Sequence, residues 1–123
     1  NDEPEPEGPA PMDAVSGALM FISRGSFERL GGFDEGYFLH VEDLDLCRRA
    51  EAEGGAVIYT PRASALHHGA TSEAPALEVE KHKGAGLNRY FLKFAETPVE
   101  RLAARVLGPG IGMLLSMRAR LKR

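Results

Sequence analysis

Residues 37–50 read YFLHVEDLDLCRRA, and they place three carboxylates at the start of a helical pattern. Leu46, Cys47 and Ala50 fall three, four and seven residues after Asp43. Asp43 therefore heads the apolar stripe that should face the protein interior. A carboxylate in this position is predicted to be buried or to lie at the mouth of a cleft.

Asp45 has a simpler interpretation. It lies about 200° round the helix from Asp43, and Arg49 follows it by four residues, which is the spacing of a solvated ion pair. Arg48 and Arg49 are accordingly predicted to belong to a solvated face and not to bind phosphate. Cys47 is the single cysteine, so it cannot form an internal disulfide, and its place on the stripe predicts a buried thiol in a reducing compartment.

Length and composition predict one globular domain at most. The chain has 123 residues, of which 43% are hydrophobic and 27% charged, and this composition excludes disordered and membrane-embedded classes. The longest apolar stretch, 106–117, is too short to span a bilayer and contains Gly108-Pro109-Gly110. The acidic, proline-rich start does not resemble a signal peptide, so we expect a cytoplasmic location.

The first third of the chain predicts a loose start, a strand and a short helix. Residues 1–12 alternate Pro with Glu and Gly and should form a flexible lead-in, with order beginning at Asp13. The apolar run 14–22 is predicted to be a central strand covered on both faces. Ser23 is a candidate N-cap for a short helix that stops at Gly31-Gly32, and a turn at residues 33–36 leads to the acidic helix.

The acidic helix should run to about Glu53 and end at Gly54-Gly55. Beyond it, residues 56–60 are predicted to form a strand and residues 64–68 a second extended segment. The polar stretch that follows, up to Lys83, is predicted to be a mobile loop. Apolar residues from Leu87 to Phe94 predict a helix that ends at Thr97-Pro98. The final segment, 99–123, is one helix or two helices around the Gly-Pro-Gly sequence, and strands alternating with helices indicate an α/β fold class.

Several motifs in a fixed order carry a family resemblance: Val15-Ser16-Gly17-Ala18, Gly31-Gly32-Phe33-Asp34-Glu35, Phe38 through Glu42-Asp43-Leu44-Asp45-Leu46-Cys47-Arg48-Arg49, and Pro61 and Ala63 leading to His67-His68-Gly69. They resemble the C-terminal half of a family 2 glycosyltransferase, in particular the rhamnosyltransferase-like branch that builds bacterial surface polysaccharides. The resemblance implies the C-terminal part of a GT-A fold, a short mixed sheet with flanking helices. The single Asp-x-Asp, at 43–45, belongs to the acidic helix, so the donor-binding half is expected to lie outside these residues.

The resemblance implies inverting transfer of a sugar from a nucleotide-sugar donor to an acceptor hydroxyl, with Asp43 as general base. The alternative for Asp43 is a buried helix-capping aspartate. Glu42, Phe38 and His40 are candidate acceptor-binding residues, although Phe38 could equally pack in a core and His40 could be solvated. His67 is the candidate ligand for a divalent metal, Mn²⁺ or Mg²⁺, in the complete enzyme, or else a polar edge residue.

The resemblance divides the chain into the lead-in 1–12, an acceptor and catalytic-base half at 13–96, and a C-terminal amphipathic basic helical segment at 97–123. Residues 101–123 contain six Arg or Lys and no acid, a pattern that suits contact with an anionic membrane surface or an ordinary surface helix. The acceptor is expected to be a glycan or a lipid-linked sugar. Overall acidity argues against a nucleic-acid binder.

Two further expectations concern the isolated chain. Without a donor-binding half, the strand at 15–22 should have an unpaired edge, which predicts a homodimer through this strand or by exchange of the C-terminal helices. The same absence predicts that the chain is inactive alone. A non-catalytic module that binds glycan or a partner subunit is the alternative function.

Overall fold

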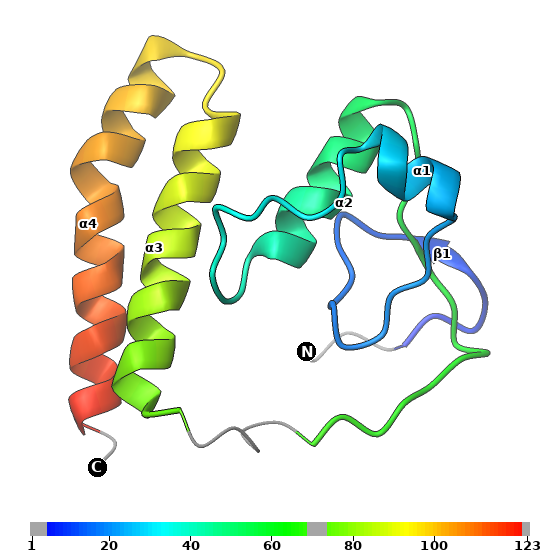
Figure 1. Ribbon diagram of the computed structural model, residues 1–123, viewed down its shortest axis with the longest axis horizontal. Coiled ribbons are helices and arrows are strands. Elements are labelled where there is room, and N and C mark those ends of the chain that lie inside the picture. The colour runs from blue at the N-terminus through cyan, green and yellow to red at the C-terminus, as the bar shows by residue number, and fades with distance from the viewer. Residues whose placement is uncertain (1–4, 69–73, 122–123) are drawn as a thin grey trace. The chain divides into compact units, whose positions relative to one another are not determined.

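The computed structural model describes residues 5–68 and 74–121, and this part of the chain is mostly helical (Figure 1). It contains helices α1 (Arg24–Arg29), α2 (Glu42–Ala52), α3 (Ala76–Phe94) and α4 (Pro98–Leu121). Two strands, β1 (Ala10–Pro11) and β2 (Ile58–Tyr59), form a small antiparallel sheet. The chain divides into two compact units, one within residues 1–34 and 43–69 and the other within 35–42 and 70–123.

The sheet of the first unit joins the lead-in to the predicted strand at 56–60. Ala10 pairs with Tyr59 and Pro11 with Ile58, and the Met12 amide donates to the Val57 carbonyl at 3.0 Å. The Tyr59 hydroxyl also donates to the Glu5 carboxylate, and this hydrogen bond raises the pKa of Tyr59. Backbone pairing therefore begins before Asp13, earlier than the sequence indicates.

The predicted central strand at 14–22 is wrong. This segment contains a turn, in which the Leu19 amide donates to the Ser16 carbonyl at 3.3 Å, and the Phe21 side chain is 85% exposed. The apolar run therefore lacks the covering layers that a buried strand requires. The dimer predicted from an unpaired edge at 15–22 loses its basis, because no strand is described there. The extended piece at 64–68 is also irregular.

The predicted helix caps of the first unit are confirmed. The Ser23 hydroxyl accepts the Ser26 amide at 3.1 Å and caps α1. α1 ends at Arg29, and the chain leaves it through Gly31 and Gly32, whose φ values are 77° and 70°. A left-handed backbone conformation of this kind costs glycine little free energy. α2 ends in the same way, at Gly54 with a φ of 76°.

The side chains of α2 confirm the apolar stripe and correct the prediction for Asp45. Leu46 and the free thiol of Cys47 are buried as predicted. Asp45 is also buried, with 0% exposure, and its Oδ2 accepts from the Arg49 Nε at 2.7 Å. The predicted pair therefore forms, but it is an interior ion pair and not a solvated one.

Arg49 joins α2 to the end of α1. Its guanidinium donates to the carbonyl oxygen of Leu30 and, at 2.9 Å, to that of Gly32. The last carbonyls of a helix have no partner within the helix, and a basic side chain can satisfy them. Arg49 thus neutralises Asp45 and caps α1, so its prediction as a solvated residue is wrong.

In the second unit, α3 and α4 form an antiparallel hairpin (Figure 1). The predicted loop up to Lys83 is wrong from Ala76 onward, because α3 begins there, while residues 69–73 of that loop lie outside the described part. Lys81 donates to Glu78 at 2.7 Å on the first turns of α3, and this hydrogen bond lowers the pKa of Glu78. The predicted helix end before Thr97-Pro98 is confirmed.

A capping box starts α4. The Thr97 hydroxyl accepts the Glu100 amide at 3.1 Å, and the Glu100 carboxylate accepts the Thr97 amide at 2.9 Å. This reciprocal pair satisfies two donors at the helix start. Within the described residues no helix is long and apolar enough to cross a membrane.

The two helices of the hairpin pack through glycines. A Cβ on Gly84 would lie 2.5 Å from the Gly112 Cα, and a Cβ on Gly108 would lie 1.8 Å from the Asn88 Oδ1. Close packing of this kind stabilises α4 against the poor helix propensity of Gly108-Pro109-Gly110. α4 is therefore a single helix that contains Pro109. Of the two predictions for residues 99–123, one helix or two, the first is confirmed.

We predict that Arg49→Ala lowers the free energy of unfolding by about 3–5 kcal/mol, because it removes the Arg49 charge from the buried Asp45 carboxylate. Arg24→Ala is the matched control, since Arg24 and Glu28 form an ion pair of the same i,i+4 spacing at 2.8 Å with exposed side chains. The control should lose at most about 1 kcal/mol. Urea unfolding measures the free energy of unfolding of both variants. Equal losses of free energy in the two variants would contradict the structural role of the interior pair.

A second prediction concerns the hairpin. Gly84→Ala should destabilise the chain by about 1–2 kcal/mol, because overpacking against Gly112 outweighs the gain in helix propensity. Gly110→Ala is the control within α4, where an added Cβ meets no atom within 4 Å, and it should gain up to about 1 kcal/mol. Thermal unfolding compares the two, and a stabilised Gly84→Ala would refute the close helix contact.

Candidate functional site

Asp43 lies in the first turn of α2, half-buried. Its Oδ2 accepts the backbone amide of Gly17 at 2.9 Å, and its Oδ1 accepts the amide of Leu44 at 2.9 Å. Both carboxylate oxygens are therefore oriented by backbone donors. Asp43 is thus not fully buried, and its predicted place at the mouth of a cleft stays a prediction.

The contact with Gly17 joins two motifs that are 26 residues apart in the chain. A Cβ on Gly17 would lie 3.4 Å from the Asp43 Cβ and 3.6 Å from its Oδ2. Glycine lets the 15–18 backbone approach the carboxylate closely, which explains why a small residue suits this point of the turn. Sequence spacing gave no signal of this contact, because no periodic pattern links a turn to a helix so far along the chain.

The arrangement leaves Asp43 able to accept a proton. A carboxylate has about four lone-pair positions, and each oxygen here uses one for a backbone amide. The remaining positions can accept a hydrogen bond from a hydroxyl group. The alternative of a buried helix-capping aspartate does not fit, because Asp43 is half-buried inside α2 and binds the amide of the next residue, not one two or three residues on.

Glu42, in the second unit, has a polar atom without a partner. Its Oε2 is buried, and within the described part of the chain it accepts no hydrogen bond. A buried carboxylate oxygen that lacks a donor costs free energy. The Glu42 carboxylate therefore has one enclosed oxygen that the described residues leave without a donor.

The residues before Glu42 have an unusual backbone. His40 and Val41 have φ values of 66° and 76°, a region that is uncommon for non-glycine residues and strained for a β-branched one. Val41 is buried, and a Cβ on Gly86 of α3 would lie 3.1 Å from the His40 carbonyl oxygen and the Val41 side chain. Packing against a glycine of α3 thus accompanies the strained conformation.

Phe38 is exposed and stacked, so the alternative that it packs in a core is wrong. Its ring is 81% exposed and lies 4.4 Å from the His82 ring, centroid to centroid, at an angle of 34°. His40 is exposed as well, as its solvated alternative predicts. An exposed aromatic face next to an imidazole can stack on a flat apolar surface of a ligand.

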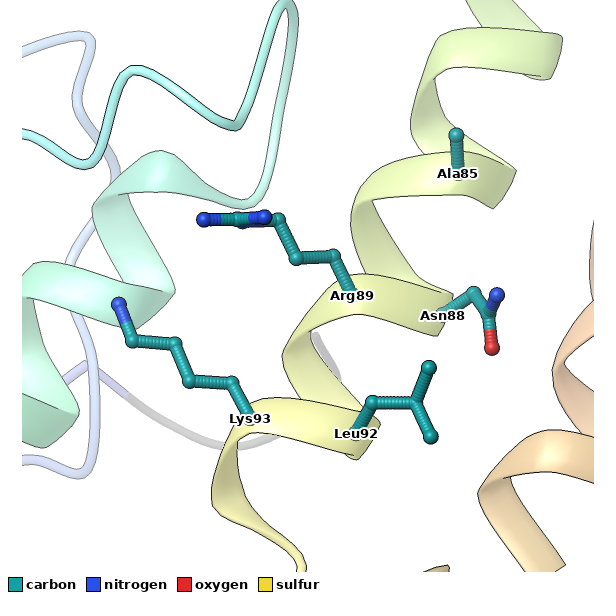
Figure 2. A pocket seen from close by; sticks show the side chains of 5 residues that line it. All are labelled: Ala85, Asn88, Arg89, Leu92 and Lys93. Atoms are coloured by element: carbon teal, nitrogen blue, oxygen red, sulfur yellow. The ribbon is translucent and has the colours of Figure 1, made fainter.

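Tyr37 binds two cations of α3 that the sequence did not single out. The Arg89 guanidinium lies 5.4 Å and the Lys93 ammonium 5.8 Å from the centre of the buried Tyr37 ring. Figure 2 shows Arg89 and Lys93 on one side of α3, with Asn88 and Leu92 on the other. These four residues and Ala85 line a shallow hollow. Arg89 and Lys93 hold the 35–42 segment through their contacts with the Tyr37 ring.

The adjacent histidines of the predicted metal site lie outside the helices. His67 and His68 are both exposed, in an irregular segment of the first unit. In residues 5–68 and 74–121 no group of three His, Cys, Asp or Glu side chains could hold a metal ion. Asp45 cannot serve as a ligand while it is buried against Arg49.

Known proteins resemble part of this chain. It is 39% identical over 74 residues to N-acetylglucosaminyl-diphospho-decaprenol L-rhamnosyltransferase of Mycobacterium tuberculosis, a match of 58% of this chain and 24% of that protein. It is 39% identical over 57 residues to rhamnosyltransferase WbbL of Escherichia coli, covering 46% of this chain and 22% of the relative. The O-antigen biosynthesis protein RfbC of Myxococcus xanthus is 36% identical over 59 residues.

These matches show homology to glycosyltransferases over part of the chain. The chain spans about a quarter of the length of the first two relatives. No protein-family model matches the chain, and no solved structure matches it significantly.

Proposed function

We propose that these residues form the acceptor-side, base-bearing part of an inverting glycosyltransferase with a GT-A fold, of the rhamnosyltransferase-like branch. The observation that carries the proposal is the Asp43 carboxylate, oriented by the Gly17 and Leu44 amides and still open to a further hydrogen bond. The partial identity to two rhamnosyltransferases supports it independently. The donor-binding half, and the nucleotide-sugar it binds, belong to a longer protein.

In the proposed reaction an acceptor hydroxyl attacks the anomeric carbon of the sugar. The new glycosidic bond forms as the bond to the nucleotide diphosphate breaks, and the diphosphate leaves with the electron pair. Asp43 accepts the hydroxyl proton as the oxygen attacks. The two backbone hydrogen bonds keep the carboxylate in one orientation, which is what a positioned base requires.

Acceptor binding is proposed for Glu42, Phe38 and His40. The Glu42 carboxylate has an oxygen without a donor among the described residues, which a sugar hydroxyl could supply only if the enclosing side chains move, and the exposed Phe38 ring offers a stacking surface. A lipid-linked acceptor is favoured because the mycobacterial relative is named for a diphospho-decaprenol substrate. Bacterial surface polysaccharide synthesis at the cytoplasmic side of the membrane is the corresponding process.

We predict that Asp43→Asn, made in the longer protein, lowers kcat by a factor of about 10² or more while the affinity for the nucleotide-sugar changes little. Glu42→Gln is the matched control on the neighbouring residue, and it should raise KM for the acceptor more than it lowers kcat. Donor binding by calorimetry and initial rates measure these effects. Near-normal turnover of folded Asp43→Asn would refute the base assignment.

A divalent metal, Mn²⁺ or Mg²⁺, is proposed for the longer protein, with His67 as one ligand. The described residues do not form a metal site by themselves, so no step above uses the metal. His67→Ala should weaken Mn²⁺ binding by about tenfold or more, and His68→Ala is the matched control. Equal Mn²⁺ affinity in calorimetric titrations of both variants and the parent would exclude His67 as a ligand.

A further inference from the structure

α4 has two chemically different faces. One face consists of small residues spaced by four, namely Ala104, Gly108, Gly112 and Ser116. Gly108 and Gly112 pack against α3, and the Ser116 hydroxyl bonds back to the Gly112 carbonyl at 2.8 Å. This face is therefore occupied within the hairpin.

The opposite face is apolar and uncovered. We define the outer face of α4 by eight residues that are between 54% and 85% exposed: Val99, Leu102, Val106, Leu107, Met113, Leu114, Met117 and Leu121. At 100° per residue they lie in one arc of about 140°, opposite the small residues. A continuous apolar patch of this kind marks an interaction surface and is not ordinary solvent-facing surface.

Basic residues border this face at its C-terminal end. Arg118 and Arg120 lie in the last turn of α4, one on either side of the apolar arc, whereas Arg101 and Arg105 lie on the side of the small residues. No acid occurs between residues 101 and 123. Arginine can lay its apolar stem along a lipid surface while its guanidinium stays at the level of the headgroups. The C-terminal end of the outer face can thus meet negative charge.

We propose that the outer face of α4 binds an anionic membrane surface, with the helix lying in the plane of the headgroups. The uncharged run between Arg105 and Arg118 is about 18 Å long, too short to cross a bilayer and long enough to rest in its interface. The proposal uses no residue of the proposed catalytic site, so it stands or falls separately from glycosyl transfer.

Charge favours lipid over a second copy of this chain as the occupant. Two outer faces in contact would bring together helices that each carry Arg118 and Arg120 beside that face and no acid after Glu100. Like charges at such an interface oppose association. An anionic bilayer offers the opposite charge, and each basic residue near it adds about fivefold to the affinity.

The test measures sedimentation of the 123-residue chain with vesicles of phosphatidylcholine alone or mixed with phosphatidylglycerol. Binding to the mixed vesicles should be at least tenfold tighter and should weaken with salt. Leu114→Glu on the outer face should reduce it about tenfold or more. The matched control is Leu66→Glu, because Leu66 is also exposed (83%) but lies in the other unit, and it should bind like the parent.

A second pair of variants tests the charge. Arg118→Gln with Arg120→Gln should weaken binding about 25-fold, whereas Arg24→Gln with Arg62→Gln should not. Absence of vesicle binding by the parent would overturn the proposal, as would equal losses in Leu114→Glu and Leu66→Glu. If the parent chain does not bind vesicles but self-associates, and Leu114→Glu abolishes the self-association, the outer face is a dimer interface instead.

Discussion

The first unit depends on the interior ion pair between Asp45 and Arg49. A fully buried carboxylate is tolerated only when its charge is compensated and its oxygens are hydrogen-bonded. Arg49 meets this requirement and at the same time binds the carbonyls of Leu30 and Gly32. The pair therefore fixes α2 against the end of α1. A domain is stable by only about 5–15 kcal/mol, so one such interaction is a large fraction of the total.

This pair also separates the roles of two neighbouring aspartates. Asp45 is enclosed and has an arginine partner, whereas Asp43 is half-buried and is held by backbone amides. An arginine would compete for a proton-accepting carboxylate, and backbone amides orient it without bringing a full positive charge. Asp45 thus serves the fold, and Asp43 stays available for the proposed role as general base.

The second unit shows how glycine can stabilise a helix pair despite its low helix propensity. Gly84, Gly108 and Gly112 bring α3 and α4 into close contact, and the packing gained there offsets the flexible and proline-containing sequence around Pro109. Because the small residues face α3, the large apolar residues of α4 face outward. The same helix therefore provides both the hairpin contact and an exposed apolar surface bordered by arginines.

Local signals in the sequence determined the elements whose causes are local. The Ser23 cap, the glycine stops after α1 and α2, the buried stripe of Leu46 and Cys47 and the i,i+4 partner of Asp45 all follow from neighbours within a few residues. Contacts between distant segments decided the rest. The contact of Arg49 with Gly32 joins residues 17 positions apart, and that of Gly17 with Asp43 joins residues 26 apart. Periodicity contains no information about such partners. Only the tertiary structure could show that an apolar run is left exposed or that a charged residue is enclosed, because burial depends on which segments pack together.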